Sequence, residues 1–102
     1  MPLSSKQRAE LRAEAHRLTA TVHVGHQGVT DALVQSLDDA LRTHELVKVA
    51  LNRTVDANPK ELAGELANRA KADVVQVIGK TATLFRRNPD LERKDGVPPW
   101  RR

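Results

Sequence analysis

The sequence has no cysteine, very few aromatic residues and no long apolar run. The absence of cysteine excludes disulfides, thiolate zinc sites and cysteine nucleophiles. Phe85 and Trp100 are the only aromatic residues, so a core must be built from leucine, valine and alanine. No stretch of about 18 apolar residues is present to span a membrane, and no apolar segment near the start indicates a secretory signal. We therefore expect a cytoplasmic protein that makes no membrane contact.

The chain of 102 residues is long enough for one domain. Its 39% apolar and 29% charged residues are typical of a small folded core rather than of a disordered chain. The net charge of +4 is unevenly placed, because residues 29–45 carry −3 whereas residues 74–87 carry +3 and no acid. A basic segment of this kind favours a polyanionic partner.

Apolar periodicity and capping residues predict three helices. Ser4 and Gln7 form a capping box before the apolar stripe of the first helix. Thr30 is suited to cap the second helix. Asn58-Pro59 begins the third helix with a capping amide followed by proline at the first helical position.

Four short segments rich in β-branched residues predict strands at residues 21–24, 46–51, 74–78 and 81–86. Gly79-Lys80 has the length of a tight hairpin turn between the last two. We expect an α/β fold, a single compact domain of order α-β-α-β-α-β-β with a four-stranded mixed sheet and helices packed on it. Because helices separate the first three strands, the sheet should be mostly parallel, and the hairpin should add an antiparallel strand.

The composition changes at residue 88. Residues 88–102 combine three prolines with dense mixed charge, and their apolar side chains are Leu91, Val97 and Trp100. We therefore assign residues 1–87 to the folded domain and residues 88–102 to a flexible charged tail.

No group of residues predicts an enzyme. Gly79-Lys80-Thr81 lacks the first glycine of a nucleotide-binding loop, since position 74 is valine. His23 and His26 lie three apart across a strand end, which is a poor spacing for a metal site. Adjacent helical residues point about 100° apart, so Asp38 and Asp39 are expected on a solvated face rather than as a catalytic pair. We expect no catalysis, cofactor, metal or small-molecule substrate.

The strongest site candidate is the GxxG segment formed by Gly25, His26, Gln27 and Gly28, between a strand and a helix start. Glycines let a ligand approach the backbone closely, and a GxxG loop clamps the nucleic-acid backbone in some RNA-binding modules. A tight strand-to-helix turn would require the same glycines, so both interpretations stand at this point. Basic residues that could gather near the loop are Lys6, Arg8, Arg12, Lys80, Arg86 and Arg87.

Four strings in a fixed order carry a family resemblance. They are LSSKQR at residues 3–8 with Leu11-Arg12 and Ala15-His16, the GxxG segment, HELVKV at residues 44–49, and VQVIGKT at residues 75–81 followed by Leu84-Phe85-Arg86. Together they resemble the CRM domain (chloroplast RNA splicing and ribosome maturation) in its stand-alone bacterial YhbY-like form, over about residues 3–87.

The resemblance implies an RNA-binding domain similar in fold to the C-terminal domain of bacterial translation initiation factor three. Bacterial members are associated with precursors of the large ribosomal subunit, so ribosomal RNA, and ribosomal proteins beside it, are the expected partners. The RNA-binding residues would be Gly25, His26, Gln27 and Gly28 with Lys6, Arg8, Arg12, Lys80 and Arg86. With two aromatic residues in the chain, recognition should depend on phosphates and shape. The alternative is a protein-interaction adaptor that uses the acidic second helix.

Overall fold

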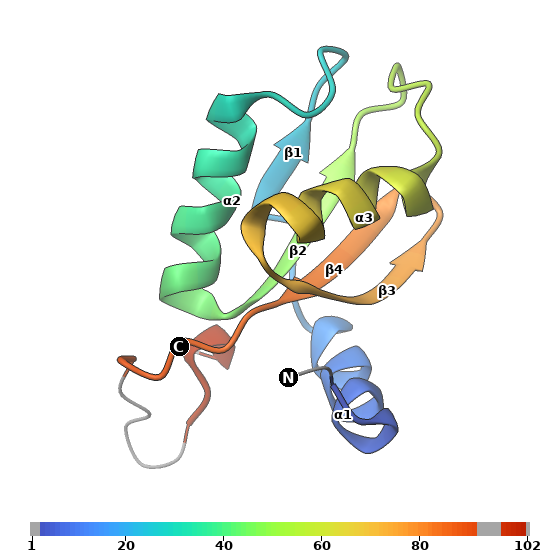
Figure 1. Ribbon diagram of the computed structural model, residues 1–102. Coiled ribbons are helices and arrows are strands. Elements are labelled where there is room, and N and C mark those ends of the chain that lie inside the picture. Colours follow the sequence, from blue (N-terminus) through green and yellow to red (C-terminus); the bar gives the residue numbers. More distant parts are fainter. Residues whose placement is uncertain (1–2, 92–96, 102) are drawn as a thin grey trace.

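Three helices begin where the sequence places capping residues. The computed structural model describes residues 3–91 and 97–101, and in it α1 spans Ser5–Ala15, α2 spans Asp31–His44 and α3 spans Pro59–Ala70 (Figure 1). The Ser4 hydroxyl accepts from the Gln7 N–H, and the Gln7 side chain accepts from the Ser4 N–H, which confirms the capping box. Thr30 and Asn58 cap α2 and α3 as predicted.

Four strands form one sheet in the order β1-β2-β4-β3. Their bounds are Val22–Val24 for β1, Leu46–Leu51 for β2, Asp73–Ile78 for β3 and Thr81–Phe85 for β4. Gly79-Lys80 joins β3 to β4 as the predicted hairpin turn. The predicted α/β class, element order and mixed sheet are confirmed.

The position of β4 changes the character of the sheet. β1 pairs with β2 in parallel, whereas β4 pairs antiparallel with both β2 and β3. The sequence favours a mostly parallel sheet with the hairpin added to it, but β4 is inserted between β2 and β3. The first three strands do run in one direction, yet only β1 and β2 are parallel neighbours in the described sheet.

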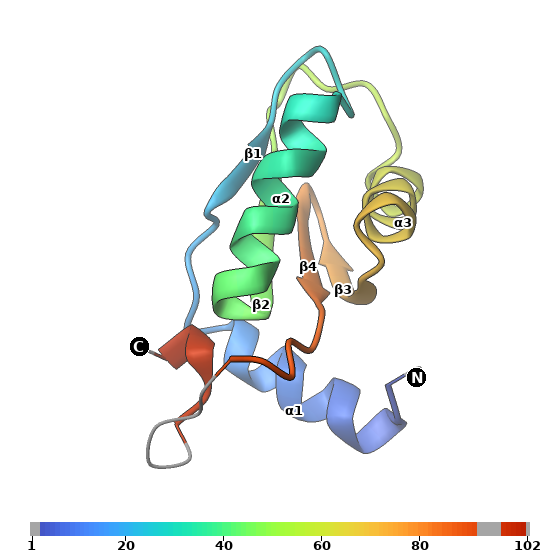
Figure 2. The same ribbon diagram turned by 60° about the vertical axis from the view of Figure 1, so that its left-hand side comes forward.

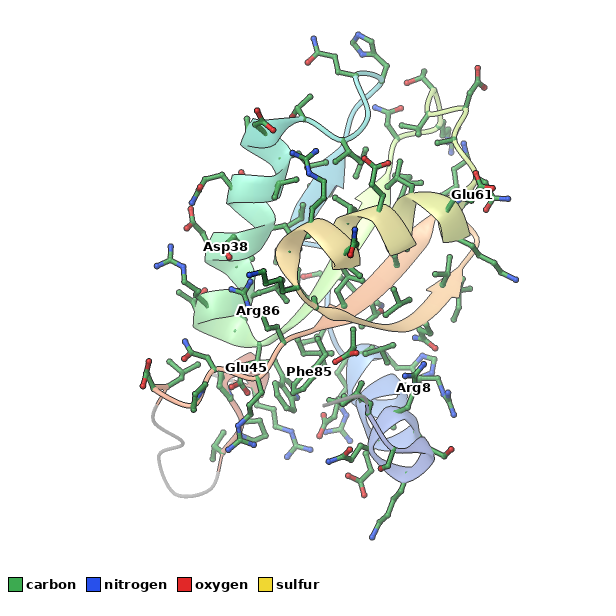
Figure 3. All side chains as sticks on the ribbon, in the orientation of Figure 1. Arg8, Asp38, Glu45, Glu61, Phe85 and Arg86 are labelled. Carbon is green, nitrogen blue, oxygen red and sulfur yellow. The ribbon has the colours of Figure 1, made fainter. Side chains whose placement is uncertain are left out.

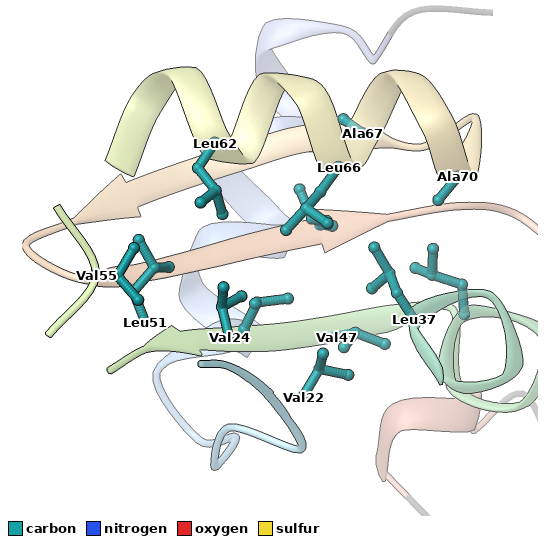
Figure 4. Close-up of a cluster of buried hydrophobic side chains, with 13 residues drawn as sticks. Val22, Val24, Leu37, Val47, Leu51, Val55, Leu62, Leu66, Ala67 and Ala70 are labelled. Atoms are coloured by element: carbon teal, nitrogen blue, oxygen red, sulfur yellow. The ribbon is translucent and has the colours of Figure 1, made fainter. Parts of the chain in front are cut away.

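The main core lies between the sheet and the pair α2 and α3, which cover the same face (Figure 1). Alternate residues of the strands point into it, and leucines of both helices fill the space between them (Figure 4). Its most buried members, with at most 2% of their surface exposed, are Val24, Leu37, Leu41, Val47, Val49, Leu66 and Leu84. At about 1.5–3 kcal/mol for each fully buried side chain, this aliphatic core is the main stabilising element of the fold.

A smaller cluster lies on the opposite face of the sheet, where α1 packs. Leu11 of α1 contacts this face together with Leu46 of β2 and Val75 of β3, and Phe85 and Trp100 pack against them. The helix lies at the end of the sheet farthest from the loops that follow β1 and β2 (Figures 1 and 2). The two faces of the sheet are therefore covered unequally.

The C-terminal segment requires a correction. Residues 88–102 are expected to form a flexible tail, but Pro99–Arg101 form a short 3-10 helix in which Pro99 is buried. The Trp100 ring meets the Phe85 ring edge-on at a centroid distance of 6.0 Å. The Arg101 guanidinium pairs with Glu14 of α1, and their hydrogen bond raises the pKa of Arg101. The aromatic edge and this ion pair hold residues 97–101 against the domain, while residues 92–96 and 102 lie outside the described part of the chain.

Asp38 lies only in part on the solvated face expected for it. Arg86, at the end of β4, donates through Nη1 to Asp38 Oδ1 at 2.8 Å and to the Ala70 carbonyl at 2.7 Å. The side chain of Asp38 is 38% exposed and that of Arg86 is 21% exposed. Sequence periodicity places Asp38 on the polar side of α2, and the end of β4 passes close enough for Arg86 to pair with it.

Candidate nucleic-acid interface

The GxxG segment is a turn that projects beyond the end of β1. His26 and Gln27 occupy its centre, and the Gly28 N–H donates to the Gly25 carbonyl at 3.0 Å. Gly28 has a φ of +72°, a conformation that other residues adopt only with strain. Both interpretations of the glycines therefore have a physical basis, because the turn uses Gly28 for its geometry while the two central side chains are exposed.

Glycine also leaves the backbone of this turn accessible. A Cβ atom built on Gly25 or on Gly28 would meet no atom within 4 Å, so both positions open to solvent. Gly25 does not have a positive φ, so close backbone access, rather than conformation, is what glycine contributes there. Phosphate oxygens can approach main-chain atoms at such a position.

A hollow of about 350 Å³ lies between the turn and the first turns of α2. It is lined by His23, Gly25, His26, Gln27, Gly28, Thr30, Ala32, Leu33 and Ser36. The lining combines hydrogen-bonding groups with a small apolar floor and contains no carboxylate. This composition is compatible with part of a nucleotide.

Two further loops lie at the same edge of the sheet as the GxxG turn. The Asn52 N–H donates to the Val24 carbonyl at 2.9 Å, which places residues 52–58 beside the turn. Lys80 Nζ donates to the carbonyls of Arg53, at 3.0 Å, and Val55, at 3.3 Å. We call this edge, formed by residues 25–28, 52–58 and 79–80, the loop edge. Lys80 brings a positive charge to it and also fixes the neighbouring loop.

The basic residues predicted for the site do not gather in one place. Lys6, Arg8 and Arg12 belong to α1, which lies at the opposite end of the molecule from the loop edge (Figures 1 and 2). The molecule measures 41 Å along its longest axis. Closeness in the sequence does not bring basic residues together here. Lys80 and Arg86 flank opposite ends of β4, and six residues of extended chain span about 20 Å.

Arg86 faces the interior of the domain rather than the loop edge. Figure 3 shows it between α2 and α3, close to Asp38. Its guanidinium also donates to the Asp38 carbonyl at 3.2 Å. We therefore leave Arg86 out of the interface that we propose below.

The three aspartates of α2 form ion pairs with arginines. Asp31 accepts from Arg69 of α3 at 2.7 Å. Asp38 and Asp39 both pair with Arg42, and the hydrogen bond from Arg42 to Asp39 is the largest cause of a raised pKa of that guanidinium. The acidic helix is thus a compensated surface, which weakens the alternative of an adaptor that uses its charge.

Sequence reasoning missed Lys48 as a candidate. It lies in the middle of β2 between the buried residues Val47 and Val49, so it points to the opposite face of the sheet from both. Its Nζ donates to the Leu18 carbonyl at 3.2 Å, in the segment that follows α1. A lysine between two apolar residues of a strand is the signal that could have found it.

No helix within residues 3–91 and 97–101 combines the length and apolar character needed to cross a membrane. The same residues contain no group of three or more histidine, aspartate or glutamate side chains placed to hold a metal ion.

The fold and the GxxG turn define a small α/β domain with a glycine-bounded turn at one end of its sheet. The family model of the CRS1/YhbY (CRM) domain matches residues 3–86, which is most of the chain. The chain belongs to this family.

Several proteins named as probable RNA-binding proteins are similar to this chain. The chain is 34% identical over 89 residues to "Probable RNA-binding protein PA4753" of Pseudomonas aeruginosa, a match that covers 87% of this chain and 86% of the relative. It is 32% identical over 88 residues to "Probable RNA-binding protein YqeI" of Bacillus subtilis, covering 86% of this chain and 92% of the relative.

A solved structure has the same fold. The solution structure of the protein SAV1595 from Staphylococcus aureus is similar with a TM-score of 0.77 and 30% sequence identity. The match covers 89% of this chain and 95% of the other. The arrangement of α1 to α3 around the sheet is therefore shared with a structure solved in solution.

Proposed function

We propose that this protein is a non-enzymatic RNA-binding protein of the cytoplasm that docks on structured ribosomal RNA in precursors of the large ribosomal subunit. The GxxG turn contacts the RNA backbone, and basic residues near it hold flanking phosphates. The relatives named above as RNA-binding proteins support the RNA part of this proposal. The ribosomal part depends on the resemblance to bacterial YhbY-like proteins.

The observation that carries the proposal is the open geometry of the GxxG turn. Gly25 and Gly28 leave the backbone exposed on both sides of His26 and Gln27, and the hollow beneath them has no carboxylate. A turn that served only to connect β1 to α2 would not require an exposed glycine with ordinary φ at position 25. Gly25 therefore favours a ligand that approaches the backbone.

The identity of the RNA can be tested in cells. Ultraviolet crosslinking of the full chain, followed by sequencing of the bound RNA, should enrich precursor RNA of the large ribosomal subunit over other cellular RNA. Enrichment of messenger RNA or of no RNA would contradict the ribosomal proposal. Partners that survive ribonuclease treatment in a parallel pulldown would favour the adaptor alternative instead.

The role of the turn can be tested with one isosteric pair of variants. Gln27→Glu places a negative charge in the GxxG turn, whereas Asn68→Asp places the same charge on the exposed surface of α3. Both variants lower the net charge from +4 to +3, so their bulk electrostatics match. We expect Gln27→Glu to weaken RNA binding by about tenfold, because the carboxylate repels the phosphate nearest to it, and Asn68→Asp to leave it nearly unchanged. Equal affinities of the two variants would show that the turn is only a connection.

A further inference from the structure

Between the loop edge and α1, one face of the sheet carries two rows of side chains that no helix fully covers. The strand register places His23, Ala50, Thr81 and Ile78 in the row nearest the loop edge. Lys48, Thr83 and Gln76 form the next row. We call these seven residues the open rows. Their neighbours in sequence, such as Val49 and Ala82, point into the core on the other face.

The open rows end where α1 begins to cover the sheet. The next row contains Leu46, Phe85 and Asp73, and Leu11 of α1 packs there. Thr83 is 1% exposed, whereas Ile78, at the outer end of the first row, is 60% exposed. His23, at the other end of that row, is exposed as well. The face is thus accessible on the side of the loop edge and closes toward α1.

The open rows carry no negative charge. The open rows contain one lysine, one histidine and no carboxylate. The acids of α2 and α3 belong to the helices that cover the opposite face of the sheet (Figure 1). A polyanion could therefore lie along the open rows without meeting a carboxylate there. Asp73, the one acid of the four strands, lies in the next row, paired with Phe85.

The two arginines of α1 lie on a different side of the helix from its two glutamates. Gln7, Glu10 and Glu14 line a groove with Trp100, on the side of the helix that faces the C-terminal segment. Helical periodicity places Arg8 and Arg12 on the other side of the buried residue Leu11. Figure 3 shows Arg8 on the side of α1 that is turned toward β3. Arg8 and Arg12 are thus on the side of α1 turned toward β3, and Glu10 and Glu14 are not.

We infer that the open rows are a second RNA-binding surface, which connects the GxxG turn to Arg8 and Arg12 and makes the interface continuous along the molecule. This inference rests on the proposed RNA-binding function and extends it from the turn to a face. The phosphate backbone of one RNA would run from the turn across His23 and Lys48 to the basic side of α1. The separated basic groups of the site then act on the same ligand.

The continuous surface explains two features that the turn alone leaves without a role. Lys48 is a charged residue in the middle of a strand, and its ammonium group lies beside the end of α1. Ile78 is a large aliphatic side chain exposed on a strand. A lysine supplies a charge for phosphate, and an exposed aliphatic side chain can contact a ribose or the face of a base.

The experiment uses three isosteric variants of the full chain, each with a net charge one unit lower. Gln76→Glu changes the open rows, Gln27→Glu changes the turn, and Asn68→Asp changes the exposed side of α3 as the matched control. The probe is a fluorescein-labelled RNA hairpin with a stem of about 16 base pairs, the span that double-stranded RNA-binding domains cover. Fluorescence anisotropy measures the Kd, and thermal melts establish that each variant is folded.

We expect Gln76→Glu to raise the Kd by about threefold to tenfold, because its carboxylate would lie under the phosphate backbone. Asn68→Asp should change the Kd by less than about 1.5-fold, because screening by salt isolates it from the opposite face. If Gln27→Glu weakens binding and Gln76→Glu does not, the turn binds RNA and the second surface is wrong. If neither variant differs from Asn68→Asp, both the proposed function of the turn and the second surface fail.

A second variant of the open rows keeps the inference testable if Gln76→Glu does not fold. Ile78→Glu places a carboxylate at the most exposed position of the open rows. It should weaken binding at least as much as Gln76→Glu while leaving the melting temperature close to that of the parent. If Gln76→Glu and Ile78→Glu are both folded and both bind RNA as the parent does, the inference is wrong. That result would also be expected if this face bound another protein rather than RNA.

Discussion

Arg86 Nη1 lies 2.8 Å from Asp38 Oδ1, and this contact joins the end of β4 to the middle of α2. The same nitrogen donates to the Ala70 carbonyl at the end of α3, at 2.7 Å. One guanidinium therefore links three elements of the fold. Because its side chain is only 21% exposed, its charge depends on these partners for stabilisation.

Replacing Arg86 should destabilise the fold. Arg86→Met keeps much of the aliphatic stem but leaves Asp38 and the Ala70 carbonyl without their donor. We expect the free energy of unfolding to fall by about 1–3 kcal/mol, since hydrogen bonds to charged groups are worth about that much and the pair is partly exposed. Urea denaturation measures this change. Arg42→Met is the matched control, and its exposed ion pairs should make it nearly neutral.

The same variant separates a structural role of Arg86 from a role in binding. Because the guanidinium is directed to Asp38 and Ala70, a folded Arg86→Met protein should bind RNA with a Kd within about threefold of the parent. A larger loss of RNA affinity, in an Arg86→Met protein whose melting temperature is well above the assay temperature, would show that Arg86 contacts RNA.

The C-terminal segment should contribute to stability through Trp100. Trp100→Ala removes the edge-on contact with Phe85 and part of the smaller core cluster. We expect a loss of about 1–3 kcal/mol in the free energy of unfolding and a lower melting temperature. Val97→Ala, at a position that is 39% exposed, is the control and should have almost no effect. Identical melting temperatures for the two variants would contradict the packing of residues 97–101 on the domain.

The two glycines of the turn should respond differently to alanine. Gly25→Ala meets open space and needs no positive φ, so the fold should tolerate it. Gly28→Ala also meets open space, but its φ of +72° is unfavourable for alanine, so we expect a loss of about 1 kcal/mol in stability. If RNA contacts the backbone at Gly25, then Gly25→Ala weakens binding at an unchanged melting temperature. Parallel melts and binding curves for both variants distinguish the two roles.

The sequence predicts the elements of this fold well because their signals are local. Ser4, Thr30 and Asn58 mark helix starts through hydrogen bonds to residues two or three positions away, and Gly79-Lys80 marks a hairpin through its length. The insertion of β4 between β2 and β3 is a long-range pairing, and no local pattern encodes it. The packing of Trp100 on Phe85 has the same long-range character, so composition alone suggests a tail.

The candidate site likewise could be predicted from the sequence only where its residues are contiguous. The GxxG turn is visible in the sequence because its residues are contiguous. The surroundings of Arg86 are not, since Asp38 and Ala70 lie 48 and 16 residues away from it in the chain. Lys48 was detectable in principle from the alternation of β2, but its relation to α1 depends on which face that helix covers.

RNA binding should depend strongly on salt, because few aromatic side chains leave electrostatics to supply most of the affinity. If about four to six phosphates are neutralised, the logarithm of the association constant should fall against the logarithm of salt concentration with a slope of roughly −4 to −5. A slope near zero would contradict an interface dominated by phosphate contacts. Titrations at several salt concentrations with the hairpin probe give this slope directly.

The slope also reports which arginines touch phosphate. Arg12→Gln should reduce its magnitude by about 0.9, the value for one phosphate contact on duplex B-DNA, because the proposed surface continues to the side of α1 that carries Arg8 and Arg12. Arg42→Gln removes the same charge from α2, where Arg42 is held by Asp38 and Asp39, and should leave the slope unchanged. If both variants reduce the slope equally, the chain binds RNA through its net charge rather than through a defined face. If only Arg42→Gln reduces it, RNA lies on α2, and α1 does not take part in binding.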